Sequence, residues 1–172
     1  MLGERDCIVE LERQGRLRAV VTQNTDGWHQ LAGTSAELVA EIHGSMRTWR
    51  CEMCAATGPM EEMIARVRAG DSDPRCPRCG GITRATVILF EEVLDTGVLG
   101  RALDAATDCD AIVAVGTSLS VYPVAGLFPL ARQHGAYGAI VNASATGFDD
   151  EADEVIRGQL DEVLPQLFGI PV

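Results

Sequence analysis

Short apolar runs that end in polar clusters recur along the chain. Residues 19–21 lead into Thr22-Gln23-Asn24, residues 111–115 into Gly116-Thr117-Ser118, and residues 139–141 into Asn142. Runs rich in β-branched residues are typical of strands buried on both faces of a parallel sheet. Each polar cluster alone is also ordinary turn chemistry. Three together favour a ligand crevice at the carboxyl ends of the strands, where open α/β sheets bind their ligands.

Helical patterns lie between these runs. Apolar residues at spacings of three and four predict helices, and glycines follow two of them as C-caps do. A further apolar run at 87–90 predicts another strand. The alternation predicts a Rossmann-like α/β domain with a parallel sheet, formed by residues 1–44 and 84–172. The predicted helices of this domain cover residues 6–14, 98–107, 123–134 and 159–168.

Residues 45–83 interrupt the alternation and predict a small inserted module. This stretch is rich in Cys, Pro, Gly and Arg, and its only helical pattern covers residues 60–69. A segment of this composition cannot form a large apolar core, so a bound metal is expected to stabilise it.

Two C-x-x-C pairs supply the ligands for that metal. A gap of 21 residues separates the two pairs, and Gly80-Gly81 follow the second. Each pair brings two thiolates to one ion, and four sulfurs complete a tetrahedral zinc site without an open position for catalysis. The glycines let backbone N–H groups face the sulfurs. Redox-active or unpaired thiols are the alternative. The predicted structural Zn²⁺ ligands are Cys51, Cys54, Cys76 and Cys79.

Composition narrows the possible partners and location. The 172 residues carry a net charge of −11, which disfavours direct binding to nucleic acid or to an anionic membrane surface. No apolar run approaches the roughly 18 residues of a membrane helix, and the start of the chain lacks a signal pattern. We expect a soluble, cytoplasmic protein, in which cysteines serve as ligands or free thiols.

Two further features are candidates for chemistry. Thr22 to Gly27 places amides and a carboxylate on one strand-to-loop turn, a set suited to ribose hydroxyls and a carboxamide. His43 ends an apolar segment directly before the inserted module, at a junction where clefts form. A structural, hydrogen-bonded histidine is the alternative.

The ordered set of motifs resembles the sirtuin family. In chain order these are TQNTDGWH from Thr22, EIHGS from Glu41, the two C-x-x-C pairs with Gly80-Gly81, FEE from Phe90, GTSLSVYP from Gly116, and Val141-Asn142. The resemblance covers nearly the whole chain. It implies NAD-dependent removal of acyl groups from protein lysines, on a Rossmann domain with an inserted zinc module.

The resemblance also implies roles for individual residues. His43 matches the general base that deprotonates a ribose hydroxyl after the acyl oxygen has displaced nicotinamide, and Asn24 is the second catalytic candidate. NAD is the co-substrate, and an acyl-lysine protein or peptide is the partner, bound as an added strand. The implied NAD-binding residues are Gln23, Asn24, Asp26, Gly116, Thr117, Ser118 and Asn142. The implied substrate-binding residues are Ile88, Phe90 and Val121.

The sequence departs from the family pattern at several positions. It contains no counterpart of the family's first strand and Gly-rich phosphate loop, G-A-G-x-S, so we expect a truncated member whose activity depends on that loop. Glu91 stands at the position where the family's usual Phe-Gly-Glu motif has its glycine. Two alternatives to the enzyme are open: a non-catalytic sirtuin remnant that binds nucleotides or partners, and an unrelated zinc-ribbon scaffold.

Overall fold

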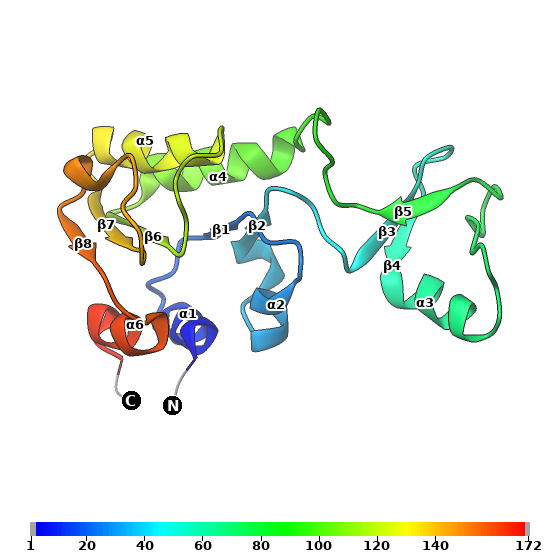
Figure 1. Cartoon of the computed structure of the whole chain (residues 1–172), viewed down its shortest axis with the longest axis horizontal. Helices are drawn as coiled ribbons and strands as arrows, with labels where there is room; N and C mark the ends of the chain where they lie inside the picture. Colours follow the sequence, from blue (N-terminus) through cyan, green and yellow to red (C-terminus); the bar gives the residue numbers. More distant parts are fainter. Residues whose placement is uncertain (1–2, 171–172) are drawn as a thin grey trace. The chain divides into compact units, whose positions relative to one another are not determined.

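A computed structural model describes residues 3–170 of the chain, which form two compact units (Figure 1). The described part of the first unit comprises residues 3–21, 28–40 and 96–170, and the second comprises residues 22–27 and 41–95. The predicted 45–83 module lies inside the second unit. No helix among residues 3–170 is long and apolar enough to cross a membrane.

The first unit is built on a parallel sheet in the order β6-β7-β8. Val115 at the end of β6 pairs with Val141 at the end of β7, so the chain leaves both strands at the same edge. Helices α4 and α5 pack together, as do α1 and α6. The bounds are β6 Ala111–Val115, β7 Tyr137–Val141, β8 Glu154–Ile156, α1 Glu4–Arg13, α4 Thr96–Asp108, α5 Leu127–Gln133 and α6 Leu160–Phe168.

Two apolar clusters hold this unit together. Phe128 of α5 packs with Ala114 and Ile140 from the middle of β6 and β7. The other cluster joins Cys7 of α1 to Leu164 of α6. The Cys7 thiol is completely buried and therefore serves as a small apolar side chain. Buried alanines of α4 and α5 have the same role.

The second unit carries an antiparallel sheet in the order β4-β3-β5, with α3 against β3 and β4 (Figure 1). Its core is small: Trp49, Met63 and two of the paired cysteines are its buried members. A core of this size needs a further source of stability. The bounds are β3 Thr48–Cys51, β4 Thr57–Pro59, β5 Thr83–Ala85 and α3 Met60–Arg68.

Strands β1 and β2 form a separate two-stranded sheet. Short helical elements complete the fold. The bounds are β1 Val20–Thr22, β2 Val39–Glu41 and α2 Trp28–Ala32, with 3₁₀ turns η1 Ala36–Leu38, η2 Val124–Gly126 and η3 Asp149–Glu151.

The predicted helices and the three apolar-run strands are present with small shifts of their ends. The predicted strand at 87–90 is wrong. The strand β5 ends at Ala85, before this run. The Ile88 N–H then donates to the carbonyl of His43 (2.9 Å), and a turn begins at Leu89. The run lies on a loop, where Leu89 is exposed and Phe90 wholly so. Periodicity could not distinguish a buried strand from an exposed loop here, because a short apolar run fits both structures.

Candidate functional site

The four predicted zinc ligands lie together in the second unit. Their sulfur atoms are all within 4.8 Å of one another. The Cys51 and Cys79 sulfurs are 3.5 Å apart, and those of Cys54 and Cys76 are 3.7 Å apart. Tetrahedral zinc with Zn–S bonds of about 2.3 Å requires sulfurs about 3.8 Å apart. The donor set and its spacing therefore fit one zinc ion.

Backbone N–H groups face two of these sulfurs. The Met53 N–H donates to the Cys51 sulfur (3.4 Å), and burial of that thiol is outweighed by the N–H groups of Cys54 and Met53, which bring its pKa to about 7. The Gly81 N–H lowers the pKa of Cys79, but the neighbouring thiols raise it to about 12. The neighbouring thiols therefore differ in pKa, and a cation at their centre would stabilise all four as thiolates.

The segment from Thr22 to Gly27 is fixed by its backbone. The Asn24 N–H donates to the Thr22 hydroxyl (3.1 Å), and the Met46 N–H donates to the carbonyl of Thr25 (2.8 Å). Within residues 3–170, the side-chain amides of Gln23 and Asn24 have no hydrogen-bond partner. Asp26 lies on the same turn, half-buried. The turn therefore presents amide donors and acceptors that a ligand can use.

His43 lies on the neighbouring segment of the same unit. The Ile42 N–H donates to the carbonyl of Thr22 (3.0 Å), which places the His43 segment beside the Gln23–Asn24 turn. The half-buried imidazole has no hydrogen-bond partner among the described residues. Gly44 follows at φ +73°, and a Cβ there would lie 2.1 Å from the carbonyl oxygen of Thr86. Only glycine lets the two backbones approach this closely.

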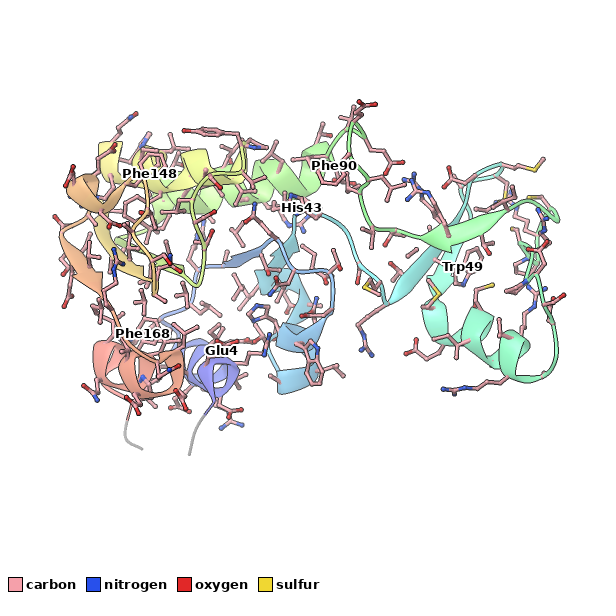
Figure 2. All side chains as sticks on the ribbon, in the orientation of Figure 1. Glu4, His43, Trp49, Phe90, Phe148 and Phe168 are labelled. Atoms are coloured by element: carbon pink, nitrogen blue, oxygen red, sulfur yellow. The ribbon has the colours of Figure 1, made fainter. Side chains whose placement is uncertain are left out.

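The substrate-binding candidates Ile88 and Phe90 lie on the chain after β5. The Ile88 N–H donates to the His43 carbonyl (2.9 Å) and so joins this segment to the histidine. His43 and Phe90 are labelled in Figure 2. Ile88 is half-buried and Phe90 fully exposed. The second unit therefore brings together Gln23, Asn24, Asp26, His43 and Ile88 through backbone hydrogen bonds.

The first unit holds the other NAD-binding candidates. Gly116 follows β6 at φ +60°, and its N–H donates to the carbonyl of Val141 (2.9 Å), directly before Asn142. Residues 116–118 and Asn142 thus leave the sheet at one edge. The Asn142 amide donates to the carbonyl of Ser144 (2.9 Å), and the Ser118 and Ser120 hydroxyls are 2.7 Å apart. Val121, the third substrate-binding candidate, is half-exposed on the following loop.

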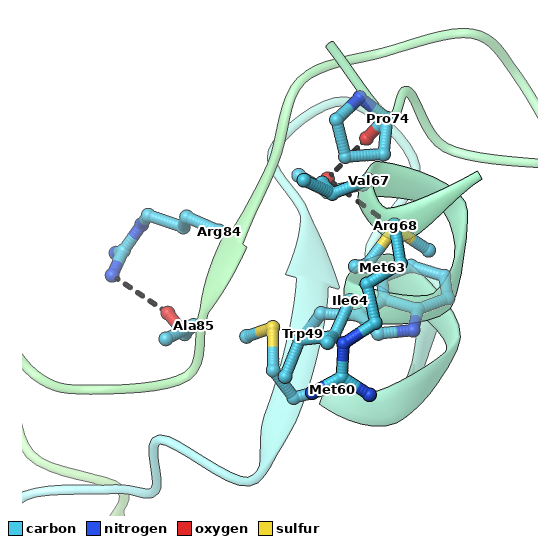
Figure 3. Close-up of a pocket in the computed structure, with 10 residues that line it drawn as sticks. Trp49, Met60, Met63, Ile64, Val67, Arg68, Pro74, Arg84 and Ala85 are labelled. Atoms are coloured by element: carbon cyan, nitrogen blue, oxygen red, sulfur yellow. Dashed lines mark hydrogen bonds between the residues drawn. The ribbon is translucent and has the colours of Figure 1, made fainter. Parts of the chain in front are cut away.

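Sequence reasoning missed two features of the second unit. One is an apolar cavity of about 470 Å³ that α3, β3 and β5 line (Figure 3). Its members Trp49, Met60 and Met63 have the ordinary spacing of core residues, so no pattern along the chain distinguishes them from a packed core. The other is an ion-pair network that reaches from Arg84 to the Ile88–Phe90 segment. The opposite charges of Arg50 and Glu52, two residues apart at the end of β3, were the available signal.

The chain matches the family model described as Sir2 family over residues 4–123. A curated NAD-dependent protein deacetylase 2 from Streptomyces coelicolor is 48% identical over 94% of this chain. A curated NAD-dependent protein deacetylase from Clostridium acetobutylicum is 40% identical over 91% of this chain. The matches span 67% and 61%, respectively, of these relatives' own lengths.

Solved structures agree with the sequence matches. A structure of a Sir2 protein with a p53 peptide and NAD⁺ superposes with a TM-score of 0.86 at 30% identity, covering 96% of this chain and 68% of that protein. The Rossmann-like α/β fold is therefore confirmed, and the interpretation as an unrelated zinc-ribbon scaffold is wrong.

Proposed function

Because the chain belongs to the Sir2 family, we propose that it is an NAD-dependent protein-lysine deacylase. Its substrates would be NAD and an acyl-lysine protein or peptide, and its products nicotinamide, O-acyl-ADP-ribose and the free lysine. The names of the deacetylase relatives and the p53 peptide and NAD⁺ in a similar structure support this reaction. The comparisons offer no support for a non-catalytic remnant.

One observation carries the proposal. The amides of Gln23 and Asn24 and the imidazole of His43, which have no hydrogen-bond partner among residues 3–170, occupy adjacent segments. Two backbone hydrogen bonds, to the carbonyls of Thr22 and Thr25, hold these segments in place. Side chains without internal partners on a fixed backbone are suited to bind a polar ligand in one orientation. A carboxamide and ribose hydroxyls need this combination of donors and acceptors.

When bound, NAD supplies the ribose carbon that the acyl oxygen attacks and the nicotinamide that leaves. His43 then accepts a proton from a ribose hydroxyl, and Asn24 orients the ribose beside it. Gln23 and Asp26 hold the carboxamide side. Gly116, Thr117, Ser118 and Asn142 would bind the adenosine half, at the edge where the chain leaves β6 and β7.

Ile88, Phe90 and Val121 would bind the acyl-lysine segment as an added strand. Leu89 and Phe90 present apolar side chains to solvent on this loop, which suits contact with a peptide and an acyl chain. Zinc held by the four cysteines would stabilise the second unit and take no part in the chemistry, because four protein ligands fill its coordination shell. A cytoplasmic location stays a prediction from the sequence.

Nicotinamide release tests the reaction. The chain, loaded with zinc, is incubated with NAD and an acetyl-lysine peptide, and nicotinamide and deacetylated peptide are measured together. We expect equal amounts of the two products, and release that depends on the acetyl group. The matched control is the same peptide with unmodified lysine. Nicotinamide release that ignores the acetyl group would contradict deacylation.

A further inference from the structure

A tight turn follows the proposed substrate-binding residues. The Glu92 N–H donates to the carbonyl of Leu89 (3.0 Å), and the Glu92 carboxylate accepts the Leu89 N–H in return (2.8 Å). Between them Glu91 has φ +71°, a left-handed conformation that side chains with a Cβ disfavour. The turn is therefore strained at Glu91 and closed by Glu92.

Two arginines of the antiparallel sheet contact the same carboxylate. Arg84 of β5 and Arg50 of β3 both contact the Glu92 Oε1 atom, Arg50 at 3.2 Å. Both guanidinium groups also contact the Glu52 Oε1 atom, each at 2.9 Å. Glu52 lies between the ligands Cys51 and Cys54. Two carboxylates and two guanidiniums thus form a neutral network from the first C-x-x-C pair to the turn.

Arg84 is fixed on its other side as well. It donates to the carbonyls of Val87 (2.8 Å) and Ala85 (3.3 Å), the second of which is visible in Figure 3. The side chains of Arg84 and Glu92 are 23% and 31% exposed, so this pair is more shielded from water than an ordinary surface ion pair. Charge-assisted hydrogen bonds of this kind are also strongly directional.

We propose that Glu92, held by Arg84 and Arg50, is a positioning residue that fixes the substrate-binding segment of residues 88–90. The segment is tied at both ends: Ile88 donates to the carbonyl of His43, and the network closes the turn at Leu89–Glu92. Phe90 lies between these two attachments, so they fix the position of its backbone while its side chain stays fully exposed. This inference rests on the proposed deacylase function for the role of the segment.

Glu92→Gln tests the proposal because it removes the charge and keeps the shape and an acceptor for the Leu89 N–H. We expect faster hydrogen exchange at the amides of residues 88–92 and a KM for acetyl-lysine peptide raised about tenfold, as for the loss of one charge-assisted bond. The KM for NAD should change less than twofold. Asp73→Asn, which removes a carboxylate from an exposed ion pair with Arg75 in the same unit, is the control.

A second variant separates positioning from general damage to the fold. Glu91→Gly removes the left-handed strain, so the turn needs the network less. In the double variant Glu91→Gly with Glu92→Gln, peptide KM and exchange at residues 88–92 should return most of the way to wild type. Zinc content should be unchanged in every variant, which confirms that the unit stays folded.

The outcomes distinguish this inference from the proposed function. Unchanged exchange and unchanged peptide KM in Glu92→Gln would overturn the positioning role, as would a double variant no better than Glu92→Gln. If wild type itself shows no acetyl-dependent turnover, the deacylase proposal fails. Hydrogen exchange at residues 88–92 then still decides whether the network fixes the segment.

Discussion

At Gly44, two segments of the candidate site approach each other closely. Its backbone lies against Thr86, whose hydroxyl also donates to the carbonyl of Ser45 (3.0 Å). This contact holds the His43 segment against the chain that leads to Ile88. The E-I-H-G-S motif therefore contains its glycine for a steric reason that the structure makes explicit.

Replacing Gly44 by alanine tests this reason. The new Cβ would meet the Thr86 oxygen at 2.1 Å, so we expect the free energy of unfolding to fall by roughly 3 kcal/mol in urea denaturation. Gly70→Ala is the matched control, because Gly70 also has positive φ (+99°) but nothing within 4 Å of its Cβ. It should lose only about 1 kcal/mol from backbone strain. Equal losses in the two variants would argue against the close approach.

Among the elements, β3, β4, β5 and α3 are the ones that we expect a metal to stabilise. Their buried core contains Trp49 and Met63 besides two of the four clustered cysteines, so we expect a zinc ion to supply much of their stabilisation.

Cys76→Ala should therefore abolish zinc binding and loosen this unit. We expect metal analysis to fall from about one zinc per chain to none, and hydrogen exchange to accelerate over residues 45–83, because structural zinc contributes folding energy directly. Helices α4 and α6 of the first unit should keep their protection. Cys109→Ala, which removes a cysteine outside the cluster, should retain the metal. Zinc retained at full stoichiometry in Cys76→Ala would contradict the four-ligand site.

A carboxylate links α1 to the segment before η1. Glu12 accepts hydrogen bonds from the Ser35 hydroxyl and from the Ser35 N–H (2.9 Å), and these bonds lower its pKa, the hydroxyl having the larger effect. A pKa below the unfolded value means that the charged form stabilises the fold above that value. This contribution is lost as pH falls through the folded-state pKa.

Glu12→Gln should accordingly lower Tm at pH 7, and its difference from wild type should shrink as the pH is lowered past the folded-state pKa. Thermal unfolding followed by circular dichroism at several pH values measures this. The exposed Glu37→Gln is the control and should leave Tm nearly unchanged at each pH. A Tm difference for Glu12→Gln that is constant with pH would show that the carboxylate charge is not involved.

Elements with a strong period or a fixed spacing could be predicted from the sequence. The helix from Leu160 and the strand from Ala111 follow their apolar patterns closely, and the cysteine spacing anticipated the sulfur cluster. The turn at Leu89 could not be predicted, because it depends on the Glu92 carboxylate and two arginines from other strands. The roles of the individual NAD- and substrate-binding residues stay predictions.

For the whole molecule, family membership and the side chains of the site point to one reaction. The second unit holds the proposed base, the amides beside it and the proposed substrate-binding segment, and the first unit holds a sheet edge with the NAD-binding candidates Gly116 and Asn142. If both groups bind NAD, Asn142→Ala should weaken NAD binding while zinc content stays constant. Isothermal titration with NAD measures this, and an unchanged Kd would remove Asn142 from the proposed site.

Turnover by His43→Ala tests the central claim most directly. The measurement is acetyl-peptide-dependent nicotinamide release with NAD, compared with wild type and with His134→Ala. The His134 imidazole is exposed and lies 2.9 Å from the carbonyl oxygen of Leu130. Loss of a general base predicts a decrease of about 10²- to 10⁴-fold for His43→Ala, with zinc retained and His134→Ala unaffected. Near-wild-type turnover by a folded His43→Ala protein would contradict the assignment of His43 and the mechanism built on it.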